Sequence, residues 1–292
     1  MTADGATIVS DPPSSPTTDR LPPYAERLRR LHRSHAAELR RAVRAVGPRP
    51  GDRCLDLGSG EGAFTRWLAE AVGPAGRVVG LDVSPAFLDR ADRATPDHQP
   101  IDWMRGDIRE PLFEPGGFDF GLTSQCLRSF PDPVFALQRL AQWVRPGGRV
   151  AVMENDRMHE GMFPWPAEVE LAMTSALVDA ARADDAEPDF GVGRRLVAYG
   201  AAAGLEQAAV AVTPVVRMTP LSGDDLAFVD AYLQDRFARA EPHLDADTRS
   251  RIASFVDPRS SDNMVRAPHG MVCFTYLWLC ARAPAGAGCT MQ

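Results

Sequence analysis

A glycine-rich turn with an acidic residue beside it is the part of the sequence best suited to chemistry. The segment CLDLGSGEGAFT (residues 54–65) places three glycines within five positions, after an apolar run and before a helical pattern. Turns of this kind usually hold a phosphate, because backbone N–H groups and a helix N-terminus favour an anion. Asp56, two residues before the first glycine, stands at the carboxyl end of a strand, where ligands of open α/β sheets bind. A carboxylate in this place favours a ligand with positive charge close to the turn.

Two cofactors compete for this turn. The letters GSGEGA match the dinucleotide pattern G-x-G-x-x-G/A with Ala63 in the last place, so a nicotinamide dinucleotide is one interpretation. Its pyrophosphate would favour amide groups over the Asp56 carboxylate. S-adenosylmethionine carries a sulfonium, an ammonium and an adenosine but no phosphate, and it suits the carboxylate better. Asp56 also has a structural interpretation, as a carboxylate that accepts hydrogen bonds from nearby backbone amides.

A second acid follows at the distance expected for a nucleoside site. Asp82 ends the strand in VVGLDVSP (78–85), twenty residues beyond Gly62. An acid at this point of a βαβ unit accepts hydrogen bonds from ribose hydroxyls, and bonds to a charged acceptor contribute about 1.5–3 kcal/mol. Asp82 therefore indicates adenosine without choosing between the two cofactors. Its structural alternative is an N-cap for the helix that begins at Pro85.

The elements that position these acids alternate between strands and helices. Such alternation implies βαβ units, and therefore a parallel sheet with helices on both faces. Strands are expected at RCLDL, RVVGLDV, IDWM, FDFGLT and RVAVME, and helices at AFTRWLAEAV, PAFLDRADRA and DPVFALQRLAQWV. In the second half, helices are expected at 164–183 and 193–205, with strands near 207–213 and at 271–280.

Four motifs in order resemble the class I S-adenosylmethionine-dependent methyltransferases. They are DLGSGEG, GLDVSP, MRGDIREPLFEPGGFDFGLTSQCLRSFPDP (104–133) and VRPGGRVAVME (144–154). The resemblance is strongest to the branch that methylates small molecules such as quinone precursors and natural products, and it covers about residues 45–155. It continues loosely through GRRLVAYGAAAGLEQAAV and does not extend to 214–270. It implies a doubly wound, seven-stranded α/β sheet in the order 3-2-1-4-5-7-6, with strand 7 antiparallel at 271–280, and added helices that form an acceptor cap.

The resemblance also implies roles for residues that match the motifs. The methionine end of the cofactor would be wrapped by Asp56 and the turn, Asp82 would hold the ribose, and Val83 would pack against the adenine. Asp107 would accept the adenine amino group beside Ile108, and Ser124 would line the cleft near the sulfonium. The cofactor-binding residues implied in this way are Asp56, Gly58, Ser59, Gly60, Gly62, Asp82, Val83, Asp107, Ile108 and Ser124.

The acceptor side departs from the family pattern. Many relatives carry histidines in the loop after the fourth strand, where this chain has CLRSF (126–130), so the usual base is missing. Arg128 is either a partner for an anionic acceptor or a surface arginine, and Trp165 is either a wall for a planar acceptor or a core residue. His159 and His35 remain as candidate bases, with a reference pKa near 6.5. Their alternatives are a solvated loop histidine and a packed histidine.

The chain divides into a core and several additions. Residues 1–22 should be a disordered tail and residues 23–46 an N-terminal cap helix. The core is expected to comprise 47–213 and 271–283, with 156–190 as an active-site insertion. Residues 214–270 are expected to form a helical insertion, in which Ser222 and Asp225 resemble a capping box.

Composition excludes several classes of protein. The chain has 292 residues and a formal net charge of -7, which argues against nucleic-acid binding, because phosphate contacts need a basic face. All 32 basic residues are arginine, so Schiff-base and P-loop chemistry, which need lysine, are excluded. The five scattered cysteines predict no metal site and no disulfide framework. The longest apolar run, 271–280, is about half a membrane span, so no membrane partner is expected and a cytoplasmic protein is predicted.

These patterns predict an S-adenosylmethionine-dependent methyltransferase with a small-molecule acceptor, in natural-product or secondary metabolism. S-Adenosyl-L-homocysteine would be the product of the cofactor. Two alternatives remain open at this point. The first is a protein of the same fold that binds the cofactor but catalyses a rearrangement or cyclisation without methyl transfer, and the second is a nicotinamide-dependent oxidoreductase. The acceptor, the methylated atom and the oligomeric state are not predicted.

Overall fold

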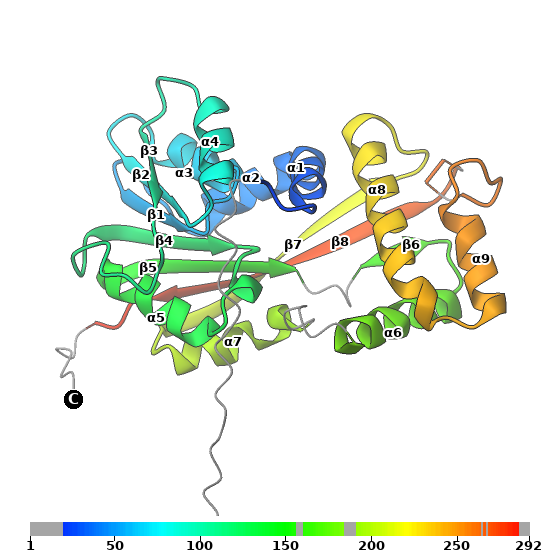
Figure 1. Ribbon diagram of the computed structural model, residues 1–292. Coiled ribbons are helices and arrows are strands. Elements are labelled where there is room, and N and C mark those ends of the chain that lie inside the picture. The colour runs from blue at the N-terminus through cyan, green and yellow to red at the C-terminus, as the bar shows by residue number, and fades with distance from the viewer. Residues whose placement is uncertain (1–19, 156–159, 184–190, 264, 267, 286–292) are drawn as a thin grey trace, which may run out of the picture.

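A mixed sheet with helices on both faces forms the centre of the molecule (Figure 1). The computed structural model describes residues 20–155, 160–183, 191–263, 265–266 and 268–285. Its strands are β1 (Arg53–Leu57), β2 (Arg77–Asp82), β3 (Ile101–Arg105), β4 (Phe118–Ser124), β5 (Val144–Asn155), β6 (Gly161–Phe163), β7 (Glu206–Met218) and β8 (Met271–Arg282). Its α-helices are α1 (Ala25–Ser34), α2 (Ala36–Ala45), α3 (Ala63–Val72), α4 (Pro85–Arg93), α5 (Pro133–Trp143), α6 (Ala167–Ala183), α7 (Val192–Ala202), α8 (Gly223–Ala240) and α9 (Ala246–Val256). Two short 3-10 helices are η1 (Leu127–Ser129) and η2 (Glu241–His243).

The sheet has the order that the resemblance implied. Strands β3, β2, β1, β4 and β5 are parallel neighbours, and β8 lies antiparallel between β5 and β7. The expected seven-stranded order 3-2-1-4-5-7-6 is thus confirmed, with β8 as the antiparallel strand 7. Among the described residues one strand was not expected: β6 pairs with the first residues of β8, from Met271 to Cys273.

Successive side chains of each strand pack into two different apolar layers, one on each face of the sheet. Cys54 and Val78 pack with α2 and α3 on one face, whereas Leu55 and Val79 pack with α5 and α7 on the other. This alternation is what a strand with both faces covered requires, since successive side chains point to opposite sides. The parallel strands therefore end together at one edge of a rigid sheet, and that edge carries the glycine turn.

The N-terminal cap consists of two helices where the sequence predicted one over 23–46. Helices α1 and α2 meet at His35, whose backbone (φ −101°, ψ 8°) leaves the helical region. The apolar stripe of the sequence is continuous through this point, so its periodicity does not reveal the break. The break turns α1 toward α8 while α2 packs on α3.

Strands β7 and β8 are long enough to leave the core and enter a second group of helices (Figure 1). Helices α6, α8 and α9 and the short strand β6 lie at that end of the molecule. Residues 214–218, which we expected within the helical insertion, belong to β7. Ser222 precedes α8 without a side-chain capping bond, and Asp225 instead accepts a hydrogen bond from Ser34, so the expected capping box is wrong. Of the helices in the described ranges, none has the length and apolarity that a bilayer crossing demands.

Candidate cofactor and acceptor site

Asp56 lies at the centre of the carboxyl edge and is fully buried. The hydroxyl of Thr65, in the first turn of α3, donates a hydrogen bond to Asp56 Oδ2 at 2.6 Å. The other oxygen, Oδ1, is buried and has no hydrogen-bond partner among the described residues. Burial raises the pKa of Asp56 to about 7, and the bond from Thr65 opposes the shift. A buried acceptor atom without a partner is the signature expected where a cationic ligand belongs.

The surroundings of the turn between β1 and α3 explain why it contains glycines. A Cβ on Gly58 (φ +75°) would lie 2.1 Å from Cys126 Sγ, so the turn packs directly on the segment that follows β4. Gly60 (φ +52°) has the opposite surroundings, with open space where a side chain would be. The buried hydroxyl of Ser59 has no partner among the described residues. The turn therefore combines a tight contact on one side with room for a ligand on the other.

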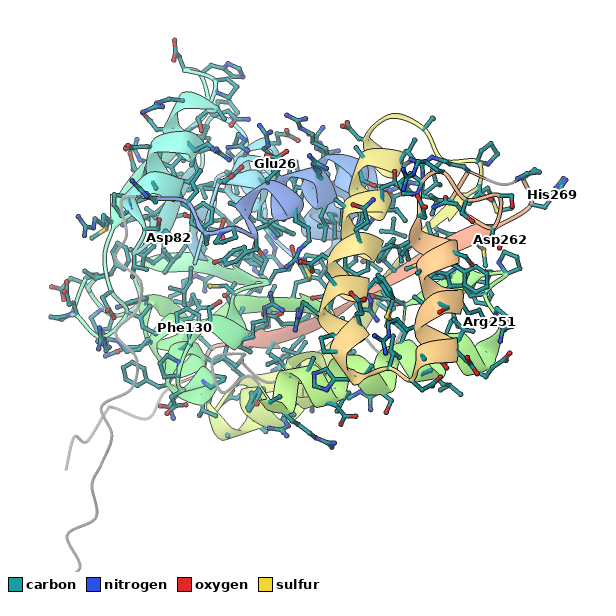
Figure 2. All side chains as sticks on the ribbon, turned by 45° about the vertical axis from the view of Figure 1, so that its right-hand side comes forward. Glu26, Asp82, Phe130, Arg251, Asp262 and His269 are labelled. Carbon is teal, nitrogen blue, oxygen red and sulfur yellow. The ribbon has the colours of Figure 1, made fainter. Side chains whose placement is uncertain are left out.

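Asp82 ties the ends of two strands together. Its Oδ2 accepts a hydrogen bond from the Gly60 backbone at 2.8 Å, and its Oδ1 accepts one from Ser84 at 2.9 Å. The N-cap of α4 is Ser84, whose hydroxyl accepts from the backbone of Phe87, so the simple capping interpretation of Asp82 is wrong. Burial raises the pKa of Asp82 against these bonds. Figure 2 shows Asp82 beside the ends of the parallel strands.

The other expected cofactor residues follow the next strands. Val83 and Ser124 are half-buried at the ends of β2 and β4, and Ile108 is buried. Asp107 is held by its neighbour, because Arg109 donates from Nη2 to Asp107 Oδ2 at 2.6 Å and lowers the pKa of that carboxyl. An adenine amino group at Asp107 would therefore compete with Arg109.

Tyr24, which the sequence did not single out as a site residue, lies over the same edge. It precedes α1 and keeps 44% of its surface exposed. Its hydroxyl interacts electrostatically with Asp82, Cys126 and Arg128. Burial, followed by the effects of Cys126 and Asp82, raises the pKa of that hydroxyl. Arg128 is half-buried in η1 and opposes the shift. The hydroxyl of Tyr24 thus interacts electrostatically both with Asp82, the ribose-binding candidate, and with Arg128.

A histidine of α1 also reaches this edge, and it is not the one expected. His32 Nε2 is 3.1 Å from Oε1 of Gln125, the residue that follows β4. Its ring lies edge-on to those of Phe64 and Trp67, with centroids 5.5 Å and 6.1 Å away. The sequence carried little signal for this, since helical periodicity does not show against which part of the molecule the face of His32 packs.

His35, the histidine chosen from the sequence, is packed inside the cap. It is fully buried, its Nδ1 atom is 2.5 Å from the hydroxyl of Tyr276, and its ring lies 5.0 Å from that of Phe228. Burial lowers its pKa to about 3. This is the packed histidine of the structural interpretation. His159, the other candidate base, lies outside the described residues.

Trp165 is buried in the second group of helices, with its ring 5.4 Å from that of Phe255 in α9. Its indole Nε1 has no hydrogen-bond partner among the described residues. Within those same residues no group of three or more histidine, cysteine, aspartate or glutamate side chains is arranged to hold a metal ion.

Comparisons with known proteins assign this arrangement to a family. A family profile described as "Methyltransferase domain" matches residues 55–152, which hold the turn, both acids and β4. The chain is 33% identical over 186 residues to the 2-phytyl-1,4-naphtoquinone methyltransferase of Synechococcus elongatus, with 60% of this chain and 79% of that relative covered. The chain belongs to the class I S-adenosylmethionine-dependent methyltransferases. The nicotinamide alternative is therefore wrong, and S-adenosylmethionine is the cofactor.

Other similarities to this methyltransferase are more partial. It is 32% identical over 123 residues to the demethylmenaquinone methyltransferase of Staphylococcus aureus, which covers 42% of this chain and 51% of the relative. The chain thus spans about half the length of that relative, and 32% of the first curated relative. Among solved structures, the YcgJ protein of Bacillus subtilis shares the fold with a TM-score of 0.55 at 14% identity, covering 86% of this chain and 100% of that one.

The residues of the methyltransferase fit its cofactor. Asp56, whose free oxygen is buried, would hold the cationic methionine end of the cofactor, and the open side of Gly60 leaves room for the bound molecule. The loop after β4 is fastened to β5, since the carboxylate of Glu154 accepts a hydrogen bond from the Leu127 backbone at 2.7 Å. When bound, the cofactor supplies an activated methyl group on a sulfonium.

Proposed function

We propose that this methyltransferase transfers a methyl group to a small, planar acceptor of the quinone or related natural-product class. The observation that carries the proposal is the cluster that His32 forms with the buried rings of Phe64 and Trp67, beside Gln125 at the end of β4. The printed names of the two quinone methyltransferases support the same class. The role in natural-product metabolism is part of the proposal.

We assign the cofactor-binding roles as the motifs implied. Asp56 and the turn from Gly58 to Gly62 hold the cationic methionine end, and Asp82 holds the ribose. Val83, Asp107, Ile108 and Ser124 complete the site around the adenine and the sulfonium. Two facts support this assignment: Asp56 Oδ1 is an unpartnered acceptor, and Asp82 lies beside the open side of Gly60.

Orientation is the main catalytic effect that this chain supplies. The donor is already activated, so the protein has to hold two molecules in line, which can lower a barrier by roughly 7–11 kcal/mol. The rigid edge formed by β1, β2 and β4 holds one molecule, and α1 contacts the same edge through His32 and Gln125. The free thiols of Cys54, Cys126, Cys273 and Cys280 support a location in the reducing cytoplasm.

The test uses purified protein, S-adenosylmethionine and a panel of reduced naphthoquinones, hydroxylated flavonoids and simple phenols. The expected result is formation of S-adenosylhomocysteine in equal amount to a product heavier by one methylene, both measured by mass spectrometry. Asp56→Ala is the matched control, and it should abolish both. Conversion of an acceptor without S-adenosylhomocysteine would support the cyclisation alternative instead. No product from any panel member would overturn the proposed acceptor class.

A further inference from the structure

His32 lies where a helix from outside the sheet meets the carboxyl end of β4. Its partner Gln125 has φ +51°, a conformation uncommon for residues other than glycine. The backbone N–H of Gln125 donates to Met153 O in β5 at 2.8 Å, so the unusual conformation is held from the neighbouring strand. Residues held in sparsely populated conformations cluster at functional sites. The carboxamide therefore reaches α1 from a fixed point in the sheet.

The hydrogen bond between the two side chains sets the tautomer of His32. The oxygen of a carboxamide can only accept, so the Nε2 atom that faces Gln125 Oε1 carries the proton. The Nδ1 atom of the neutral ring then keeps a free lone pair. A ring in this state can take a proton from a bound molecule.

The surroundings of the ring keep it neutral. Burial lowers the pKa of His32 to about 4, and the bond to Gln125 opposes the shift. Arg66 on α3 lowers the pKa of His32 further. The other titratable neighbour is His35 at the end of α1, which is also neutral at pH 7 because burial lowers its pKa to about 3. At pH 7 the lone pair on Nδ1 is therefore available.

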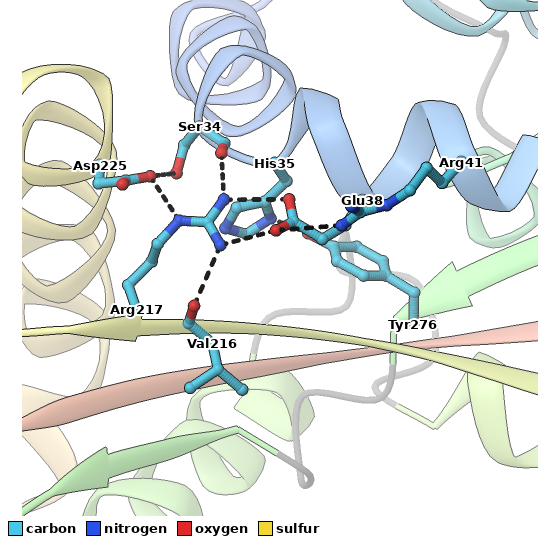
Figure 3. Close-up of polar contacts among 8 residues, drawn as sticks. All are labelled: Ser34, His35, Glu38, Arg41, Val216, Arg217, Asp225 and Tyr276. Atoms are coloured by element: carbon cyan, nitrogen blue, oxygen red, sulfur yellow. Dashed lines mark hydrogen bonds and ion pairs between the residues drawn. The ribbon is translucent and has the colours of Figure 1, made fainter.

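The helix that carries His32 is fastened to α8 and β7. Arg27 pairs with Asp235, and Ser34 donates to Asp225 at 2.5 Å. Arg217 joins these elements, since it donates to the carbonyl of Ser34 at 2.6 Å and to both Glu38 and Asp225 (Figure 3). A reacting group held by such contacts keeps its geometry, which is what catalysis by orientation requires.

We propose that His32 is the general base of the reaction, and that the acceptor presents an O–H or an acidic C–H on a planar ring. This inference rests on the proposed function and deepens it. A lone pair of the acceptor forms the bond to the methyl carbon while the carbon–sulfur bond breaks. The electron pair of the broken bond stays on sulfur. The acceptor's proton passes to His32 Nδ1 and then to solvent. In this proposal, α1 supplies the histidine that the loop after β4 lacks.

The first arm of the test is independent of turnover. Long-range proton–nitrogen NMR on protein with labelled histidines, assigned with His32→Gln, should show His32 as the neutral Nε2–H tautomer at pH 7. Saturation with S-adenosylhomocysteine and 1-naphthol, an unreactive pair with a planar O–H, should shift Nδ1 of His32. The exposed His98 should not move, and His98→Gln is the control variant. The opposite tautomer, a charged ring at pH 6, or no shift at His32 would overturn the inference.

The second arm uses the panel of acceptors. With any member that is turned over, His32→Gln should lower kcat by about 100-fold or more, since general bases contribute about 10²–10⁴-fold. The affinity for S-adenosylmethionine, measured by calorimetry, should stay within twofold, and His98→Gln should behave as wild type. A loss in kcat below threefold would overturn the role of His32 while leaving the proposed function intact. Failure of the whole panel overturns the acceptor class, and the NMR arm then decides the role of His32 alone.

Discussion

The hydroxyl of Thr65 donates to one oxygen of Asp56 at 2.6 Å, and the other oxygen is buried without a partner among the described residues. This arrangement of Thr65 and Asp56 explains why an acid stands beside a glycine turn of this kind. Thr65 fixes the direction of the carboxylate, and the free oxygen is the atom that we propose binds the cationic end of the cofactor. Burial without that cation is unfavourable for the charged form, and the raised pKa of Asp56, about 7, expresses this.

Binding of S-adenosylmethionine should therefore strengthen as the pH rises from 6 to 8. The ligand's positive charge favours ionised Asp56, and burial raises the pKa of that carboxyl to about 7. Affinity at pH 6 should be about tenfold below its value at pH 8, because one pH unit below the pKa leaves about a tenth of the group charged. Calorimetry across this range checks the prediction. Asp56→Asn should bind weakly with no such dependence, and a flat profile in wild type would contradict it.

The same carboxylate should limit the stability of the ligand-free protein. The pKa of Asp56 in the folded state lies above the value of 3.8 for the unfolded chain. Its contribution to stability is therefore fully present below pH 4, and it is lost in the window from pH 4 to pH 7. Each pH unit in that window removes about 1.4 kcal/mol. Asp56→Asn should raise Tm over wild type by several degrees more at pH 8 than at pH 5, as thermal unfolding by circular dichroism would show. An equal difference at the two pH values would refute the assignment.

Asp82→Ala should abolish measurable binding of S-adenosylmethionine. The change removes the proposed ribose acceptor and the two hydrogen bonds that join Gly60 and Ser84. Calorimetry is the measurement. Asp102→Ala is a matched control, because Asp102 is an acid of the next strand that pairs with Arg77 on the surface. Wild-type affinity in Asp82→Ala would remove Asp82 from the site.

The sequence sufficed for the parts of the molecule that local pattern determines. The strands that end at Leu57 and Asp82 and the turn between β1 and α3 follow from apolar runs and glycines. The order of the sheet came from the resemblance, since no local pattern encodes which strands are neighbours. His32 was missed because the break at His35 decides where α1 packs, and the apolar periodicity does not show that break. Tyr24 was missed for a related reason, since long-range packing alone brings it to Asp82.

Gly58→Ala should destabilise the protein and close part of the site. The new Cβ would meet Cys126 Sγ at 2.1 Å, and the backbone at φ +75° disfavours a side chain. Overpacking costs about 1–3 kcal/mol and the left-handed conformation about 1–2 kcal/mol, so Tm should fall by several degrees. Cys126→Gly in the same chain should recover the steric part. Thermal unfolding of the single and double variants tests this, and equal Tm values for the two would show that Cys126 is not the obstacle. Gly51→Ala, with φ +85° and no neighbour within 4 Å, measures the backbone contribution alone.

Arg217 should control how firmly α1 is held over the site. Its guanidinium donates to Glu38 at 3.0 Å and to Asp225 at 3.0 Å, and Arg217→Met would leave two carboxylates facing each other beside Ser34. Glu38 would keep only its longer contact with Arg41, at 3.8 Å, and Asp225 only the hydroxyl of Ser34. Partly buried charges that lose a close partner are destabilising, so the junction of α1 and α2 should open more often. Hydrogen exchange should then become faster by about tenfold or more across residues 25–45, while β1 and β4 stay protected.

The matched control for Arg217→Met is Arg251→Met, which removes the exposed ion pair between Arg251 and Glu168. Exposed pairs contribute little, about 0–1 kcal/mol, so exchange in α1 should not change. The affinity for S-adenosylmethionine should fall only slightly in Arg217→Met, because Asp56 and Asp82 belong to the sheet. Turnover of an acceptor should fall much more, because α1 carries His32 to Gln125. Equal losses in cofactor affinity and turnover would mean that Arg217 supports the whole fold and not the placement of α1.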